Sequence, residues 1–176
     1  MDDLHGVHEY TVPGTYSFKL KRRTKAKVTI VGAGQYRTRS YSKYNGWHYY
    51  SGSSGAAFVG GVILPAGAYS VHVGNSYEGP REDDTMFNTG YTYWGKSEAT
   101  VLSNSLSYLI STGEAPGAID KSSNLELIPG TIELETGGYY SFNENGQGAT
   151  SRYNGWGHGS NYDGSGYTTG YFKIEW

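Results

Sequence analysis

The sequence predicts an all-β protein: an antiparallel β-sandwich, jelly-roll-like, with long loops rich in glycine and tyrosine. Two patterns lead to this prediction. Apolar residues alternate with polar ones in short runs, and Pro-Gly turns precede those runs. The composition agrees, because 27 of the 176 residues are Gly and 18 are Tyr, whereas only 17% are charged. Aromatic residues at 15% and a net charge of -2 indicate a folded chain. We expect one domain over 10–176, preceded by an N-terminal arm at 1–9.

The expected strands follow from period-2 alternation. Every second residue is apolar in 16–20 and again in 26–30, so each segment presents one apolar face. The charged link 21–25 between them is interpreted as a hairpin connection. Two later strands are expected over 69–74 and 132–135, and a closing strand that ends at Trp176 is placed to lock into a sheet. Only 101–110 has enough apolar density for a short helix.

Turn residues and a repeat support this division. Pro-Gly or Pro-Ala-Gly turns begin at Pro13, Pro65 and Pro129, where proline fixes φ and glycine supplies a positive φ before a strand. The hexapeptide at 42–47 recurs at 151–156 with five of six residues identical, and both copies contain Tyr-Asn-Gly-Trp. The repeat indicates two loops with a shared role.

Three glycine-rich stretches, 32–61, 74–95 and 137–170, are expected to form loops that carry aromatic residues. Aromatic side chains on loops give contact area at low entropic cost, so these loops are interpreted as a binding face. An Asn-Gly turn in each repeat would present the flanking aromatic residues at a projecting tip. The alternative is that both repeat tryptophans pack beneath their own loops. The candidate binding residues are Tyr44, Trp47, Tyr49, Trp94, Tyr153, Trp156, Lys43 and Arg152.

Several function classes lack a signal in the sequence. There is no cysteine, which excludes disulfides and cysteine-ligated metals. The acidic run at 82–84 and the segment at 161–164 do not fit a calcium loop, and no histidine spacing is typical of a metal site. No nucleophile-and-base arrangement or carboxylate pair stands out. We expect no enzyme activity, no catalytic residue, no metal and no cofactor.

Charge is divided unevenly along the chain. Residues 1–43 hold nine basic and three acidic residues, a net charge of +6, whereas the remainder holds five basic and 13 acidic residues, a net charge of -8. Opposite charges of this size favour self-association, and we expect a homotrimer or a larger array. The basic cluster could attract a nucleic acid, but the acidic remainder opposes it, so no nucleic-acid partner is expected. No apolar stretch reaches the length of a spanning helix, so no membrane insertion is expected.

The order of turns, strands and glycine-rich loops resembles a known family. The residues that carry the resemblance are Val12-Pro13-Gly14, the strand at 25–31, the segment 55–61, Pro65-Ala66-Gly67, the strand at 69–74 and the closing strand at 170–176. Together they are similar to the glycine-rich domains of bacteriophage tail proteins and related bacterial surface proteins. The resemblance implies a virion or cell-surface location, oligomeric assembly and binding to a host surface.

The function expected from these observations is that of a phage virion structural or receptor-binding protein, in a tail or head fibre or decoration. Its partners would be other virion proteins and a glycan of the host surface. The acidic N-terminus has no apolar run typical of a leader, so we expect either assembly in the host cytoplasm before release in the virion or a leader that has already been removed. Two alternatives stay open: a bacterial surface adhesin or filament subunit, and a carbohydrate-binding module.

Overall fold

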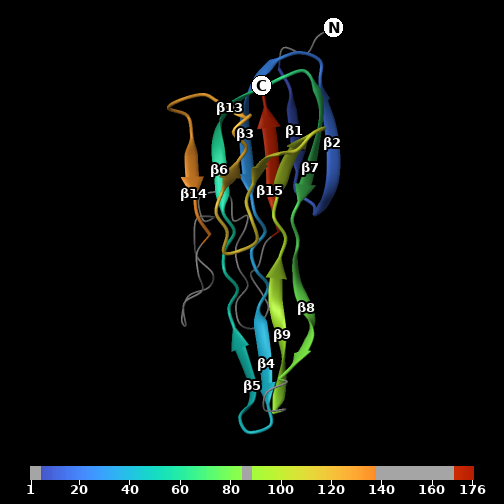
Figure 1. Cartoon of the computed structure of the whole chain (residues 1–176), viewed down its shortest axis with the longest axis vertical. Helices are drawn as coiled ribbons and strands as arrows, with labels where there is room; N and C mark the ends of the chain where they lie inside the picture. Colours follow the sequence, from blue (N-terminus) through green and yellow to red (C-terminus); the bar gives the residue numbers. More distant parts are fainter. Residues whose placement is uncertain (1–4, 85–88, 138–168) are drawn as a thin grey trace.

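The computed structural model describes residues 5–84, 89–137 and 169–176. Within these ranges the chain forms fifteen strands and no helix, and all strand pairs are antiparallel in three sheets. Two sheets form a sandwich at one end of the molecule, and the third extends from it (Figure 1). The predicted all-β class with a sandwich-like arrangement of antiparallel sheets is confirmed.

The first sheet of the sandwich contains six strands. Its order is β1-β15-β3-β6-β13, and β14 also pairs with β6. The predicted closing strand is confirmed as β15, which lies between β1 and β3. The N-terminal arm expected at 1–9 includes residues 7–9, which pair with β15. The strands are β1 (Val7–Tyr10), β3 (Thr24–Val31), β6 (Ala57–Leu64), β13 (Glu126–Leu127), β14 (Glu133–Glu135) and β15 (Tyr171–Glu175).

The second sheet packs against the first and has the order β12-β11-β10-β7-β2. Its strands are β2 (Gly14–Leu20), β7 (Gly67–Val73), β10 (Val101–Asn104), β11 (Tyr108–Ser111) and β12 (Asp120–Lys121). The core between the two sheets comes from the apolar face of each alternating strand. Burying each large side chain of this core contributes about 1.5–3 kcal/mol to folding. Its fully buried members include Val28, Ile30, Phe58, Val62, Val71, Val73, Leu102, Ile110, Phe172 and Ile174.

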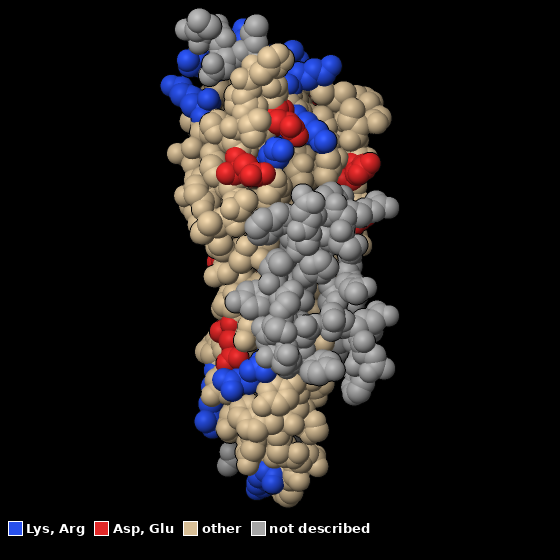
Figure 2. Space-filling model, turned by 180° about the vertical axis from the view of Figure 1, so that it is seen from behind, with Lys and Arg blue, Asp and Glu red and all other residues tan. Residues whose placement is uncertain are grey.

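Two predicted elements of the sandwich are wrong. The link 21–25 is not a hairpin, because β2 pairs with β7 and β3 pairs with β6 and β15, so the link crosses from one sheet to the other. Its exposed basic residues Lys21, Arg22 and Arg23 lie at the sandwich end, where Figure 2 shows basic side chains. The helix expected over 101–110 is the β10–β11 hairpin, whose Leu102 and Ile110 face each other inside the core.

The third sheet, which we call the distal sheet, has the order β5-β4-β9-β8. Its strands are β4 (Thr38–Ser42), β5 (Gly46–Tyr50), β8 (Ser76–Asp83) and β9 (Gly90–Ser97). The stretches 32–61 and 74–95 were expected to be loops, and this is wrong, since each contributes a hairpin to this sheet. Tyr, Trp and Thr fit a pleated sheet well, which outweighs the glycines between them. Apart from its ends, the third stretch, 137–170, lies outside the described residues.

Close backbone packing joins the sandwich to the distal sheet, in a region that we call the neck (32–37, 51–56, 74–75 and 95–100). A Cβ atom at Gly95 would lie 1.7 Å from the carbonyl oxygen of Tyr36, and one at Gly74 would lie 2.1 Å from that of Glu98. The buried Thr100 hydroxyl accepts a hydrogen bond from the Gly74 amide at 3.1 Å. Close contacts between backbone segments therefore explain why several positions in the neck are glycine.

The two ends of the described chain lie together at the sandwich. Gly6 and Trp176 exchange two backbone hydrogen bonds of 2.9 and 3.0 Å. The turn between β4 and β5 lies at the opposite end of the elongated molecule (Figure 1). Side chains of the distal sheet are therefore presented far from Gly6 and Trp176.

Candidate binding site on the distal sheet

Strand alternation places aromatic and arginine side chains on one face of the distal sheet. Tyr41 of β4 is paired in register with Trp47 of β5 and with Tyr91 of β9. Two residues away, Arg39 is paired with Tyr49 and with Tyr93, so these residues point to the same side as Tyr41. We call this surface the aromatic face, and it consists of Arg39, Tyr41, Trp47, Tyr49, Arg81, Tyr91 and Tyr93.

The rings of the aromatic face contact one another across the strands. The centre of the Tyr41 ring lies 5.4 Å from that of Trp47 and 5.2 Å from that of Tyr91. Trp47 and Tyr49 stack along β5 at 6.2 Å, and Trp47 meets Tyr91 edge-on at 5.6 Å. Ring pairs at these distances stabilise one another by about 0.5–1.5 kcal/mol beyond the area they bury. The rings therefore form a continuous surface that is ordered before any partner arrives.

Two arginines lie over these rings and are held by carboxylates. The Arg39 guanidinium lies 4.4 Å from the Tyr93 ring and 5.3 Å from the Trp47 ring, and it donates to Glu78 at 2.8 Å. Arg81 lies 3.8 Å from the Tyr91 ring, and its Nε donates to Asp83 at 2.8 Å. These hydrogen bonds raise the pKa of both arginines above its ordinary value. Both guanidiniums therefore stay charged, and each is oriented by its carboxylate.

Part of the aromatic face is accessible to solvent. Trp47 is 38% exposed and Tyr49 is 44% exposed, whereas the large aromatic side chains Phe58 and Phe172 of the core are fully buried. An exposed tryptophan offers a flat apolar surface together with one N–H donor. Beside it, the partly used guanidinium N–H groups can donate to oxygen atoms of a ligand. This combination suits a partner that has both apolar faces and oxygen acceptors.

The predicted candidate residues that the structure describes fall in three places. Trp47 and Tyr49 belong to the aromatic face, whereas Lys43 and Tyr44 lie in the β4–β5 turn, with Tyr44 74% exposed. Gly46 has the positive φ of 74° expected from the Asn-Gly signal, and the Lys43 ammonium lies 5.3 Å from the Tyr44 ring. Trp94 lies on the opposite face of the sheet. The second repeat, with Arg152, Tyr153 and Trp156, lies outside the described residues.

Trp47 does not lie beneath its own loop, which was the alternative considered from the sequence. It belongs to strand β5 and packs sideways against Tyr41 and Tyr91. Sequence reasoning did not select five members of the aromatic face, because only strand pairing brings these side chains to one side of a sheet. The signal was present, since Arg39-Ser40-Tyr41 and Tyr91-Thr92-Tyr93 alternate with the period of a strand. The five residues are Arg39, Tyr41, Arg81, Tyr91 and Tyr93.

The described ranges contain no group of three or more histidines or carboxylates that could hold a metal ion. In the same part of the chain no helix is long and apolar enough to cross a membrane. A scan of protein-family models and a search of curated proteins found no match to the chain.

Proposed function

We propose that the chain is an attachment protein of a bacteriophage particle, which binds the surface of a host cell through the aromatic face of the distal sheet. One observation supports the proposal: exposed aromatic rings lie at the end of the molecule opposite Gly6 and Trp176. A link at either end would hold the sandwich and leave the distal sheet outermost. Such a layout suits a protein that is fixed at one end and makes contact at the other.

The chemistry of the aromatic face supports a surface glycan as the partner. Sugar rings have apolar C–H faces that stack on aromatic side chains, and their hydroxyl oxygens accept hydrogen bonds from Arg39 and Arg81. The rings are already held by their neighbours and by the guanidiniums. Little side-chain entropy is then lost on binding, which favours affinity from a small contact area.

Attachment can be tested with the labelled protein on an array of bacterial surface polysaccharides. We expect binding to a subset of them, and Trp47→Ala is expected to weaken this binding about tenfold or more, since buried aromatic anchors dominate such interfaces. Tyr108→Ala is the control, because Tyr108 is a similarly exposed aromatic residue of the sandwich. Full binding by the Trp47 variant, or equal losses in the two variants, would exclude the aromatic face as the contact surface.

The virion setting needs a separate test. Antibodies against the purified chain should label intact phage particles in electron micrographs and should block their adsorption to cells. Labelling of the bacterial envelope in the absence of particles would instead identify an adhesin.

A further inference from the structure

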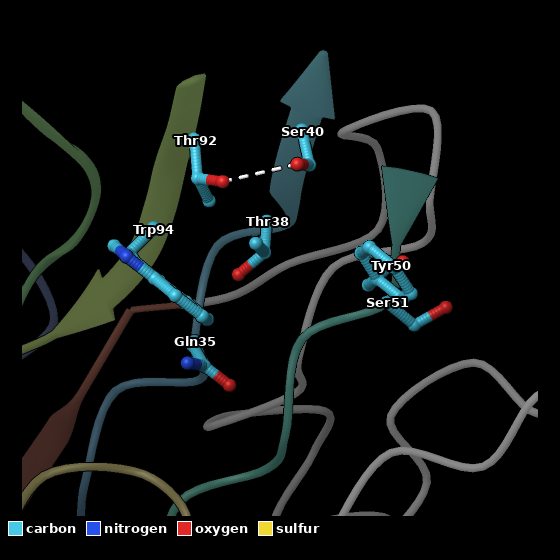
Figure 3. A pocket seen from close by; sticks show the side chains of 7 residues that line it. All are labelled: Gln35, Thr38, Ser40, Tyr50, Ser51, Thr92 and Trp94. Carbon is cyan, nitrogen blue, oxygen red and sulfur yellow. Dashed lines mark hydrogen bonds between the residues drawn. The ribbon is translucent and has the colours of Figure 1, made fainter. Parts of the chain in front are cut away.

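The face of the distal sheet opposite the aromatic face contains a polar pocket (Figure 3). Its volume is about 430 Å³, within the range of small-molecule sites. Trp94 and Gln35 line one side, Tyr50 and Ser51 line the other, and three hydroxyls lie between them. The hydroxyls belong to Thr38, Ser40 and Thr92.

The three hydroxyls retain hydrogen-bonding capacity toward the pocket. The Thr38 hydroxyl accepts from the Gly95 amide at 3.0 Å, so its own proton is available to a ligand. The hydroxyls of Ser40 and Thr92 lie 3.0 Å apart and share one hydrogen bond, which leaves one proton and several lone pairs between them. The described residues give these three hydroxyls no further partner. The centre of the pocket can therefore both donate to a ligand and accept from it.

The walls of the pocket are held in place. The Trp94 indole N–H donates to Glu82 at 2.7 Å, and 47% of the side chain remains exposed. The Gln35 side chain donates to the Gly95 carbonyl at 2.9 Å and accepts from the Ser53 amide at 3.1 Å. Both side chains are thus oriented without a ligand. A rigid aromatic wall beside fixed hydroxyls needs little reorganisation on binding.

The lining also limits the charge of a ligand. Among the described residues that line the pocket there is no Lys, Arg, Asp or Glu. A carboxylate or phosphate would lose its hydration here without gaining an opposite charge, which is costly. A purely apolar ligand would leave the hydroxyls without partners, which is also unfavourable. The ligand that fits is uncharged, carries several hydroxyls and has one flat apolar face.

We propose that this pocket binds an uncharged pyranose sugar, with one face of the sugar ring on Trp94 and its hydroxyls on Thr38, Ser40 and Thr92. The pocket and the aromatic face use different residues on opposite sides of one sheet. Sugar binding here can therefore be measured independently of attachment through Trp47.

The proposal can be tested by ligand-observed NMR on the whole chain. The probes are glucose, galactose, mannose and N-acetylglucosamine, each at about 10 mM to detect weak binding, with glucuronic acid as the charged comparison. We expect at least one neutral sugar to bind and glucuronic acid to bind at least tenfold more weakly. Trp94→Ala and Thr92→Val should each weaken the neutral sugar at least tenfold. The second variant keeps the shape of the strand residue and removes only the hydroxyl, so it remains informative if the first does not fold.

Tyr108→Ala is the control, because it removes an exposed aromatic ring of the sandwich that belongs neither to the pocket nor to the aromatic face. It should leave binding of the neutral sugar unchanged. The proposal is overturned if no neutral sugar binds, if glucuronic acid binds as well, or if Thr92→Val binds like the unaltered chain. Loss in Trp47→Ala without loss in Thr92→Val would also overturn it, since the sugar would then lie on the aromatic face.

Discussion

The guanidinium of Arg39 crosses the ring of Tyr93 to reach the carboxylate of Glu78. The ring lies 4.4 Å from the guanidinium carbon, and the ion pair closes at 2.8 Å. The three residues come from β4, β9 and β8, so the contact joins the two hairpins that build the distal sheet. It ties together segments that are far apart in the sequence and also orients the aromatic face.

Removing the charge of Glu78 should loosen this connection. Glu78→Gln keeps the shape of the side chain but leaves Arg39 without its opposite charge. Both side chains are about a quarter to a third exposed, so screening limits the loss of unfolding free energy to about 1 kcal/mol. Chemical denaturation of the variant measures it. An effect as large as that of a buried ion pair, about 3–5 kcal/mol, would contradict this solvated geometry.

A side chain at Gly95 should disrupt the neck. The Cβ atom of Gly95→Ala would lie 1.7 Å from the Tyr36 carbonyl oxygen, so the two backbones must separate. We expect the free energy of unfolding to fall by more than about 2 kcal/mol, as measured by urea denaturation. Gly46→Asn is the control: its Cβ meets nothing within 4 Å, and asparagine tolerates the positive φ of 74°. Equal stability of the two variants would refute the tight packing at the neck.

Stability should fall at alkaline pH. The pKa of Tyr171 is raised well above its ordinary value, mainly by burial and also by the hydrogen bond that Tyr171 donates to Glu9. Burial also raises the pKa of Tyr69. Each phenol is therefore protonated more readily in the folded chain than in the unfolded chain. The contribution of each phenol to the free energy of unfolding is complete below about pH 10. It is lost as the pH rises above that value.

Thermal melts from pH 7 to pH 11 test the alkaline loss. The melting temperature should be level up to about pH 9.5 and should then decline. Tyr171→Phe should make the decline shallower, because one shifted phenol is removed. A decline of unchanged steepness in this variant would show that Tyr171 does not contribute.

The uneven charge of the chain predicts self-association that depends on salt. Residues 1–43 carry a net charge of +6 and the remainder a net charge of -8, so neighbouring copies can pair opposite charges. Sedimentation at low salt should show a trimer or a larger oligomer, which dissociates as salt screens these contacts. A monomer at high concentration and low salt would count against association by charge.

The sandwich was the more predictable part of the fold. Segments such as 69–73 and 171–175 alternate strictly, and one face of each is buried as alternation requires. Alternation identifies the buried face of a strand but not its partner. For this reason β2 and β3 were expected to pair with each other, although they lie in opposite sheets.

The distal sheet was not predicted as a sheet, and the reason is physical. Glycine is costly within a strand, so stretches with many glycines were expected to be loops. Gly95 is required because two backbones touch there, and Gly46 because a turn needs its positive φ. Trp47, Tyr49 and Trp94 were expected to be binding residues because they are aromatic and lie in glycine-rich stretches, and Trp47 also because it ends the repeated Tyr-Asn-Gly-Trp. The division of the two tryptophans between opposite faces depends on strand pairing, which is a property of the tertiary structure.

The central claim is that the chain makes its contacts through the aromatic face. It is tested most directly by hydrogen–deuterium exchange of the unaltered chain, free and bound to the array polysaccharide with the strongest signal. We predict that binding slows exchange in 39–50 and 90–94, while β2, β7 and β10 of the sandwich exchange as before. Protection confined to the sandwich, with no change in the distal sheet, would contradict the account.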